Sequence, residues 1–281
     1  ILKAGDSYGR NAFGSGKTAQ VEFVSANPTG PLTVGHGRQT VLGDTLANIL
    51  TWSGYDVTRE YYFNNAGRQM RLLGESLKAR YFELKGELTL LPDGGYEGDY
   101  LIDIARALLA EKPDLDETTE IDRFKEYAEN SIFAIIKTSL ERIGVKHDVF
   151  YNERSLYEDG KIDEVLELLK AKGLLYEKDG ATWFKTSELG IEQDRVLVKS
   201  SGEPTYRLPD IAYHREKVAR GFDLVVDIFG ADHIDAYPDV LSALRVMGLK
   251  HEHIQVVIHQ FVTLMRSGEI VKMSTRKANF V

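Results

Sequence analysis

Short apolar runs alternate with longer amphipathic stretches along most of the chain. Runs rich in β-branched and aromatic residues predict strands at 20–24, 56–63, 195–198, 223–229 and 254–258. Apolar positions that recur every three or four residues predict helices at about 35–50, 66–85, 99–110, 121–143, 161–172, 209–220 and 237–247. Strands that alternate with helices are typical of an α/β fold whose parallel sheet has helices on its faces.

The middle of the chain breaks this alternation, because its helical patterns follow one another without a strand between them. Asp179 and Gly180 then join two strand-like runs, which predicts a hairpin. We therefore predict a Rossmann-like, doubly wound parallel sheet that is split by a mainly helical insertion with a hairpin. The predicted first half spans about 19–85, the insertion about 86–190 and the second half about 191–281.

Composition narrows the class of protein. A net charge of −8 argues against a basic surface that covers the whole molecule and binds nucleic acid. The absence of cysteine excludes disulfides and thiolate catalysis, and it fits a cytoplasmic location. No apolar run approaches the roughly 18–20 residues that span a bilayer, so we expect no membrane association. Because the chain begins with Ile1, we expect it to be part of a longer protein.

The segment from Ala26 to His36, A-N-P-T-G-P-L-T-V-G-H, is the first candidate for chemistry. It lies between a predicted strand and a predicted helix whose first turn carries Gly35, His36 and Gly37. The N–H groups and the dipole at a helix start attract anions, and a histidine there adds a donor for a phosphoryl oxygen. An ordinary turn-rich loop is the alternative interpretation.

A second candidate is the segment Lys272 to Arg276, K-M-S-T-R, which follows the last predicted strand. A basic loop after the carboxyl end of a strand is placed to hold phosphates at the mouth of a doubly wound sheet. Taken by itself, such a segment can equally be a solvated basic surface.

Together, the two segments resemble the paired signatures H-x-G-H and K-M-S-K-S of the class I aminoacyl-tRNA synthetases. The longer form around His36 resembles the arginyl-tRNA synthetases in particular, and the likeness covers about 19–281. Further stretches that agree are 59–67, 95–100, 206–213 and 230–233. The chain departs from the signatures at Thr33, which replaces the first histidine, and at Thr275, which replaces the second lysine.

This resemblance implies an arginine–tRNA ligase catalytic core. Such a core uses ATP to convert L-arginine into arginyl-adenylate and then transfers arginine to tRNA(Arg). Mg²⁺ would arrive with ATP and need no dedicated protein cage, and we expect no structural zinc. We expect the family's N-terminal tRNA-binding domain and C-terminal anticodon-binding domain to lie outside this sequence. We expect a monomer that is weakly active or inactive without those domains.

The resemblance also implies roles for individual residues. His36 would stabilise the transition state, and Lys272, Ser274 and Arg276 would act in the loop that closes over pyrophosphate. The residues implied to bind ATP are Thr33, Gly35, His36, Gly230, Asp232, Lys272 and Met273. Those implied to bind arginine are Glu22, Asn27, Tyr206 and Asp210. Because Thr275 lacks the charge of the second lysine, we expect Arg276 or Lys277 to supply it.

A guanidinium group is planar, always charged and rich in donors, so its pocket needs carboxylates. Tyr206 and Asp210 lie one helical turn apart and can share a face. Glu22 lies in an apolar strand, where an unpaired carboxylate would be costly. The alternatives are an outward-facing Glu22 on an edge strand and an Asp210 that only favours the start of a helix.

Two other functions remain open at this point. Another class I nucleotidyltransferase, one that adenylylates a small metabolite, would keep the loop around His36 but would not need Tyr206 with Asp210. A synthetase-like RNA-binding or regulatory paralogue without full activity is supported by Thr33 and Thr275.

Overall fold

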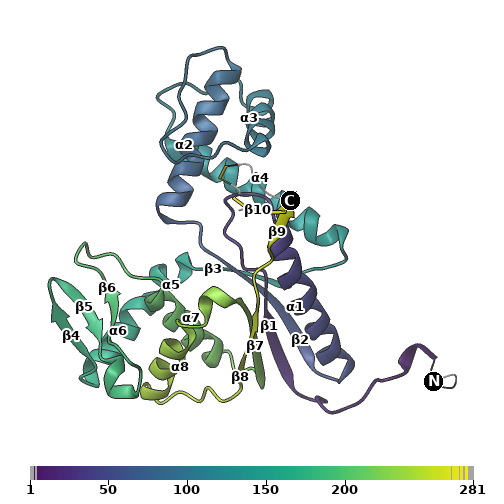
Figure 1. The fold of residues 1–281 in the computed structure, drawn as a ribbon, viewed down its shortest axis with the longest axis vertical. Helices are drawn as coiled ribbons and strands as arrows, with labels where there is room; N and C mark the ends of the chain where they lie inside the picture. Colours follow the sequence, from purple (N-terminus) through teal and green to yellow (C-terminus); the bar gives the residue numbers. More distant parts are fainter. Residues whose placement is uncertain (1–2, 4, 267, 272, 275, 278–281) are drawn as a thin grey trace. The chain divides into compact units, whose positions relative to one another are not determined.

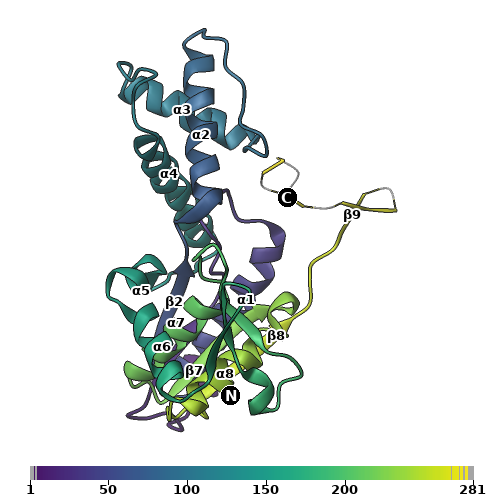
Figure 2. The same cartoon turned by 90° about the vertical axis from the view of Figure 1, so that its left-hand side faces the viewer.

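The structure is a computed structural model of the 281-residue chain, shown in two views (Figures 1 and 2). Residues 1–2, 4, 267, 272, 275 and 278–281 lie outside the described part, as do the side chains of Asp232 and Arg266. The chain forms two compact units, each of which is described by itself. The first unit comprises 1–23, 42–61 and 148–260, and the second comprises 24–41, 62–147 and 261–281.

A five-stranded sheet is the framework of the first unit. Its strands lie in the order β3-β2-β1-β7-β8, with bounds Val149–Asn152, Asp56–Phe63, Thr18–Glu22, Leu224–Gly230 and Ile254–His259. The pairs β1–β2, β1–β7 and β7–β8 are parallel. Counted along the chain this order is 3-2-1-4-5, which is the Rossmann order, and it reverses at β1. The predicted Rossmann-like α/β fold is therefore confirmed.

Strand β1 is buried along nearly its whole length because it lies between β2 and β7. Ala19, Val21 and the polar Gln20 are fully buried, and Glu22 is nearly fully buried. Strands covered on both faces are typical of parallel sheets. Gly43 of helix α1 (Val34–Trp52) lies against Phe23, and a Cβ at Gly43 would come within 2.1 Å of the phenyl ring. Glycine is required there because the helix approaches the end of β1 so closely.

The first unit also contains the helices α5 (Arg154–Glu158), α6 (Lys161–Ala171), α7 (Arg207–Ala219) and α8 (Tyr237–Val246), with short 3₁₀ turns at Gly5–Ser7, Thr186–Leu189 and Ala231–His233. Helices α6, α7 and α8 follow the predicted amphipathic pattern closely, whereas the short α5 was not predicted. Helix α8 packs on the sheet through Leu244, which joins a core cluster with Val225 and Ile254. Figure 2 shows α7 and α8 beside β7 and β8.

A small antiparallel sheet also belongs to the first unit. It consists of β4 (Leu175–Lys178), β5 (Ala181–Phe184) and β6 (Arg195–Val198). The hairpin predicted at Asp179 and Gly180 is present, with Asp179 at φ +53° and Gly180 at φ +74°. The prediction that 195–198 resumes the parallel alternation is wrong, because β6 pairs antiparallel with β5. The connection between β5 and β6 is too short for the helical crossover that parallel neighbours need.

Three long helices form the core of the second unit. They are α2 (Gly67–Leu84), α3 (Asp99–Glu111) and α4 (Ile121–Arg142), and α2 packs against both others (Figure 1). The predicted stripe of α4 is buried at Phe124, Ala128, Ile132, Ile136 and Leu140, whereas Ile143 lies just beyond the helix and is exposed. A short hairpin of β9 (Leu264–Arg266) and β10 (Glu269–Val271) lies in the last part of the unit.

The boundaries of the two units do not coincide with those of the predicted insertion, about 86–190. Helices α3 and α4 join α2, whereas the hairpin of β4 and β5 joins the unit that contains the parallel sheet. Long-range packing against α2 decides this division, and local sequence patterns do not encode it. Among the described residues, no helix combines the length and the apolar character needed to cross a bilayer.

Candidate functional site

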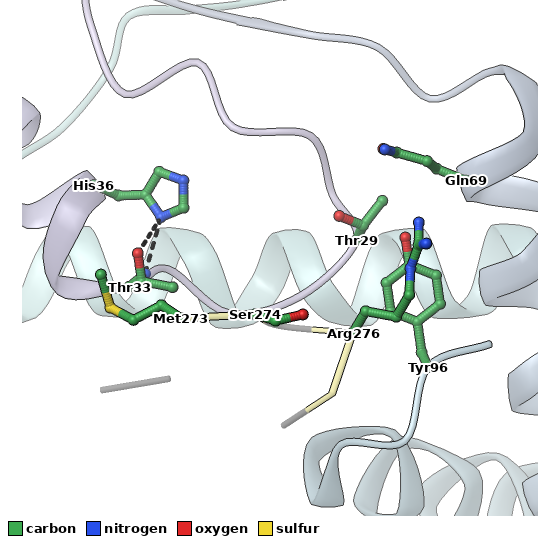
Figure 3. A pocket seen from close by; sticks show the side chains of 8 residues that line it. All are labelled: Thr29, Thr33, His36, Gln69, Tyr96, Met273, Ser274 and Arg276. Carbon is green, nitrogen blue, oxygen red and sulfur yellow. Dashed lines mark hydrogen bonds between the residues drawn. The ribbon is translucent and has the colours of Figure 1, made fainter. Parts of the chain in front are cut away.

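A pocket of about 420 Å³ lies in the second unit (Figure 3). It is bounded by the loop before α1, the first turn of α1, the start of α2, the loop before α3 and the segment after β10. The lining residues are Thr29, Thr33, His36, Gln69, Tyr96, Met273, Ser274 and Arg276. The two motifs singled out in the sequence therefore contribute side chains to one pocket.

The start of α1 holds the imidazole of His36 against Thr33. Thr33 directly precedes the first helical residue, and its N–H donates to Nδ1 of His36 at 2.9 Å. The Thr33 hydroxyl lies 3.1 Å from the same nitrogen (Figure 3). The contact with the Thr33 N–H is one half of a capping box, with a histidine in place of the usual Glu or Gln three residues after the cap. Burial lowers the pKa of His36 below its ordinary value of 6.5.

Two glycines flank His36 in the first turn of this helix. A Cβ at Gly35 would make only ordinary contacts, the nearest at 3.5 Å from the Thr33 hydroxyl, and one at Gly37 would meet nothing. Glycine in a helix costs about 1 kcal/mol relative to alanine, and packing within the described protein does not require it here. The glycines leave open space beside the first turn of the helix, which would let an anionic ligand approach the helix start closely.

Arg276 is held on the loop that precedes α3. Its guanidinium lies 5.3 Å from the ring centroid of Tyr96, and its carbonyl oxygen accepts a hydrogen bond from the N–H of Glu97 at 2.8 Å. Tyr96 is itself buried, and its N–H donates to the hydroxyl of Ser76 on α2 at 2.9 Å. The charged head of Arg276 is thus anchored at the edge of the pocket.

Three lining residues were not assigned a role from the sequence: Thr29, Gln69 and Tyr96. The Thr29 carbonyl accepts a hydrogen bond from the Tyr100 hydroxyl at 3.0 Å, which ties the loop before α1 to α3. Tyr96 and Tyr100 lie in the stretch 95–100 that resembled the family, so the signal was present although it carried no role. Gln69 lies in the first turn of α2 and had no distinguishing pattern.

The loop between β1 and α1 is hydrogen-bonded to the last residues of β2 and to the residue that follows this strand. The Ser25 hydroxyl accepts a hydrogen bond from the N–H of Tyr62 at 3.1 Å, and the Asn27 side-chain oxygen accepts one from the N–H of Asn64 at 2.9 Å. Val24 and Ser25 have φ values of +70° and +45°, and a valine rarely adopts this left-handed conformation. Asn27, which was predicted to bind arginine, therefore uses its oxygen to hold this loop.

The first unit contains a different polar feature, a row of three buried carboxylates across the parallel sheet. Glu22 on β1 is in register with Glu60 on β2 and with Asp227 on β7. Residues opposite one another in neighbouring parallel strands point to the same face. All three are nearly or fully buried. Like charges this close would be unstable without cations.

Helix α7 and the residue that follows it supply those cations. Lys217, which is 0% exposed, donates to both Glu22 and Asp227. Arg220 binds both oxygens of Glu60, at 2.5 and 3.0 Å. The Tyr213 hydroxyl also donates to Glu60, at 2.5 Å, and the His214 ring lies 3.1 Å from Asp227. Side chains from one face of α7, together with Arg220, therefore cover the carboxylate row and bind each of its members.

These ion pairs shift the pKa values of the groups that form them. Burial opposes the charge on Lys217, but Asp227 and Glu22 outweigh burial and raise its pKa above 10.5. Burial likewise disfavours the charged form of Asp227, but Lys217 and His214 lower its pKa to about 2. Although carboxylates can bind metals, the described residues contain no group of three His, Asp or Glu side chains arranged to hold an ion.

Asp210 differs from the carboxylates of the row. It lies in the first turn of α7, its N–H donates to the Tyr206 carbonyl oxygen at 3.2 Å, and the described residues provide no ion pair for it. Burial raises its pKa from 3.8 to about 6. Tyr206, one turn earlier, is 60% exposed, and the guanidinium of Arg207 lies 4.8 Å from its ring centroid. Asp210 thus has no ion pair among the described residues and lies one turn from the exposed Tyr206, whereas Glu22 is already bound to Lys217.

The other predicted residues lie as follows. Gly230 ends β7 and pairs with His259 of β8. The backbone of Asp232 lies in the 3₁₀ turn that follows, but its side chain falls outside the described part. Lys272 and Thr275 also lie outside the described residues. Ser274 accepts a hydrogen bond from the N–H of Lys277 at 3.3 Å, and Lys277 does not line the pocket.

Comparison with known proteins identifies the family. Residues 1–281 match the family described as "tRNA synthetases class I (R), catalytic domain". The chain is 57% identical to an arginine–tRNA ligase of Desulfotalea psychrophila and 53% identical to one of Salinibacter ruber. Each alignment covers 100% of the chain but only 51% and 53% of the relative, respectively, so the chain spans about half the length of these relatives.

Solved structures agree with this assignment. A Campylobacter jejuni protein assigned to the arginyl-tRNA synthetases superposes with a TM-score of 0.87 at 33% identity, covering 100% of this chain and 62% of that one. The arginyl-tRNA synthetase of Thermus thermophilus superposes with a TM-score of 0.67 at 21% identity, covering 90% and 50%, which shows a shared fold. The pocket at the start of α1, the Rossmann-like sheet and these similarities lead to one conclusion: the chain belongs to the class I arginyl-tRNA synthetases, as a catalytic domain.

Proposed function

We propose that the protein activates L-arginine with ATP and transfers it to tRNA(Arg), and that this chain holds the residues for the first step. The observation that carries the proposal is the pocket in which His36, at a helix start, and Arg276 line the same space. A helix N-terminus with a histidine and an arginine nearby suits the phosphates of ATP.

In the activation step, a carboxylate oxygen of arginine forms a bond to the α-phosphorus of ATP. The bond from that phosphorus to the bridging oxygen breaks, and its electron pair leaves with pyrophosphate. No side chain acts as a nucleophile, so the protein contributes positioning and stabilisation of phosphoryl charge. His36 and the N–H groups of α1 would bind the α-phosphate, Arg276 and Ser274 would hold the leaving pyrophosphate, and Mg²⁺ bound to ATP would share that charge.

Selection of arginine would rest on Asp210 and Tyr206. Asp210 is a carboxylate without an ion pair among the described residues, and its pKa of about 6 shows that burial disfavours its charge. An arriving guanidinium would supply the missing cation and form charge-assisted hydrogen bonds. Glu22 would contribute to the same guanidinium-binding site while Lys217 holds the Glu22 carboxylate in place.

The remaining roles also belong to this proposal. Gly35, Gly230, Asp232, Lys272 and Met273 would contact ATP together with Thr33, and Asn27 would contact the amino-acid end of arginine. In the second step, a hydroxyl of the terminal tRNA adenosine, the 2′ hydroxyl if the protein follows its class, would attack the arginyl carbonyl and release AMP. We expect the protein to work as a monomer in the cytoplasm.

Exchange of pyrophosphate into ATP tests this proposal in the intact protein, with and without tRNA(Arg). We expect arginine-dependent exchange, and a loss of about 100- to 1,000-fold in His36→Ala because one charge-stabilising donor is removed. His251→Ala is the matched control, because His251 lies outside the pocket and should leave exchange unchanged.

The outcomes of this assay also separate the alternatives. Exchange that depends on a different small molecule would point to another nucleotidyltransferase. An intact protein that binds tRNA but catalyses no exchange would point to the regulatory paralogue, and either result would overturn the proposal.

A further inference from the structure

The ring of His36 can face the pocket in chemically different ways. A neutral imidazole has a hydrogen on one nitrogen only, so the other nitrogen is an acceptor. With the hydrogen on Nε2 the pocket gains a donor, and with the hydrogen on Nδ1 it gains an acceptor that would repel a phosphoryl oxygen. The tautomer therefore decides whether His36 can bind an anion.

The backbone of Thr33 resolves this ambiguity. A main-chain N–H can only donate, and that of Thr33 points at Nδ1 of His36 at 2.9 Å. Nδ1 must therefore be the acceptor and carries no hydrogen. The hydrogen of the neutral ring is left to Nε2, which lies on the side of the ring away from Thr33 (Figure 3).

The contact arises from helix geometry. The first N–H groups of a helix have no partner within it, and in a capping box a side chain three residues after the cap reaches back to bind the N–H of the cap residue. Thr33 precedes Val34, the first residue of α1, and the N–H of Gly37 donates to the Thr33 carbonyl oxygen at 3.1 Å. The main chain of His36 makes a further contact, because the Thr40 hydroxyl donates to the His36 carbonyl oxygen at 2.8 Å.

We propose that Thr33 is a positioning residue that holds His36 as the Nε2–H tautomer through its main-chain N–H, with Nε2–H as the donor offered to the pocket. Only the use of that donor for a phosphoryl oxygen of ATP rests on the proposed function. Burial of the ring, which favours its neutral form, agrees with this arrangement. Because the main chain carries this task, it survives the replacement of the family's histidine by threonine at this position.

Nitrogen-15 NMR of the intact protein labelled at its histidines, seven of which lie in this chain, tests the tautomer directly. The His36 signals are identified by their loss in His36→Gln. We expect an unprotonated Nδ1 and a protonated Nε2 near neutral pH. A protonated Nδ1, in the neutral ring or in the imidazolium, would overturn the inference without any appeal to activity.

Two substitutions separate the main chain of Thr33 from its side chain. Thr33→Val keeps the N–H and removes the hydroxyl, so the tautomer should be unchanged. Thr33→Pro removes the N–H, so the ring should become a mixture of tautomers, and pyrophosphate exchange should fall about 10- to 100-fold with little change in the KM for arginine. A single unchanged tautomer in a folded Thr33→Pro protein would contradict the proposal.

The measurements also distinguish this inference from the proposed function. If the wild-type tautomer is as expected but no exchange occurs, the proposed function fails and the tautomer assignment survives. If exchange is robust but Nδ1 is protonated, only this inference fails. Should Thr33→Pro not fold, the wild-type and Thr33→Val spectra still decide the outcome.

Discussion

The pocket around His36 and the carboxylate row on the parallel sheet place polar groups in opposite circumstances. In the row, Lys217 and Arg220 neutralise Glu22, Glu60 and Asp227 within the protein. In the pocket, Arg276 lies over an aromatic ring, and no described carboxylate pairs with it. Charges that are paired inside the protein hold its elements together, whereas charges left unpaired beside a cavity are available to a ligand.

Asp210 shows the same contrast on a single helix. Lys217 and Asp210 both lie on α7, but the lysine is bound to two carboxylates and the aspartate has no ion pair among the described residues. Burial acts on both groups. The lysine keeps its charge because its partners outweigh burial, and the aspartate has a raised pKa because His214 and His233 offset burial only in part.

The largest effect that would test this contrast is on stability. Lys217→Met leaves Glu22 and Asp227 buried without a cation, so the free energy of unfolding should fall by about 3–5 kcal/mol. Chemical denaturation of the intact protein measures this change. Lys199→Met is the control, because Lys199 forms only an exposed pair with Glu203, and it should cost less than about 1 kcal/mol. Equal costs for the two variants would show that the row does not stabilise the sheet.

The pH dependence of stability is a second test of the ion pairs in the carboxylate row. Because the pKa of Asp227 is lowered to about 2 from 3.8, its ion pair contributes stability above pH 3.8. That contribution should be lost as the pH falls from 3.8 toward 2. Lys217→Met should remove this acid-dependent part, since the carboxylate then has no cation to favour its charged form.

The next effect separates binding from stability at Asp210. Asp210→Asn should weaken arginine binding by about 10- to 100-fold, because it removes a charged partner of the guanidinium. The same variant should be more stable near pH 7.5, by up to about 3 kcal/mol, since a carboxylate whose pKa rises from 3.8 to about 6 is destabilised when charged. The KM for arginine and thermal unfolding measure the two effects.

The sign of the pH dependence follows from the same shift. Folded Asp210 holds its proton up to about pH 6, so the protein gains stability as the pH falls from 6 toward 3.8, while arginine affinity declines over the same range. Asp210→Asn should show neither change. Asp163→Asn, at an exposed carboxylate on α6, serves as the control. A destabilised Asp210→Asn protein with normal arginine affinity would refute the assignment.

The smallest expected effect concerns the charge that replaces the second lysine of the family signature. Arg276 lines the pocket and Lys277 does not, so Arg276→Ala should slow pyrophosphate exchange about tenfold, equivalent to about 1.4 kcal/mol. Lys277→Ala should change the rate by less than about twofold, the two variants being matched neighbours with the same loss of charge. If Lys277→Ala has the larger effect, the anchoring of Arg276 on Tyr96 has no role in the reaction.

Much of the fold could be predicted from local patterns. The strand around Val21, the helix around Ile132 and the hairpin at Gly180 follow from periodicity and turn residues, which act over a few neighbours. The orientation of β6 could not be predicted, because its run of apolar residues fits a parallel or an antiparallel neighbour equally well. Strand β3 was not predicted, and it is short and only partly buried along its length.

For the candidate site, the sequence by itself determined the contact between Thr33 and His36. The two residues are three positions apart, so once a helix begins at Val34 its geometry brings them together. Only the tertiary structure decided that Glu22 pairs with Lys217, which is 195 residues away. Hydrogen bonds within one helical turn are encoded by spacing, whereas the partner of a buried charge depends on which helix covers the sheet, and no local pattern specifies that choice.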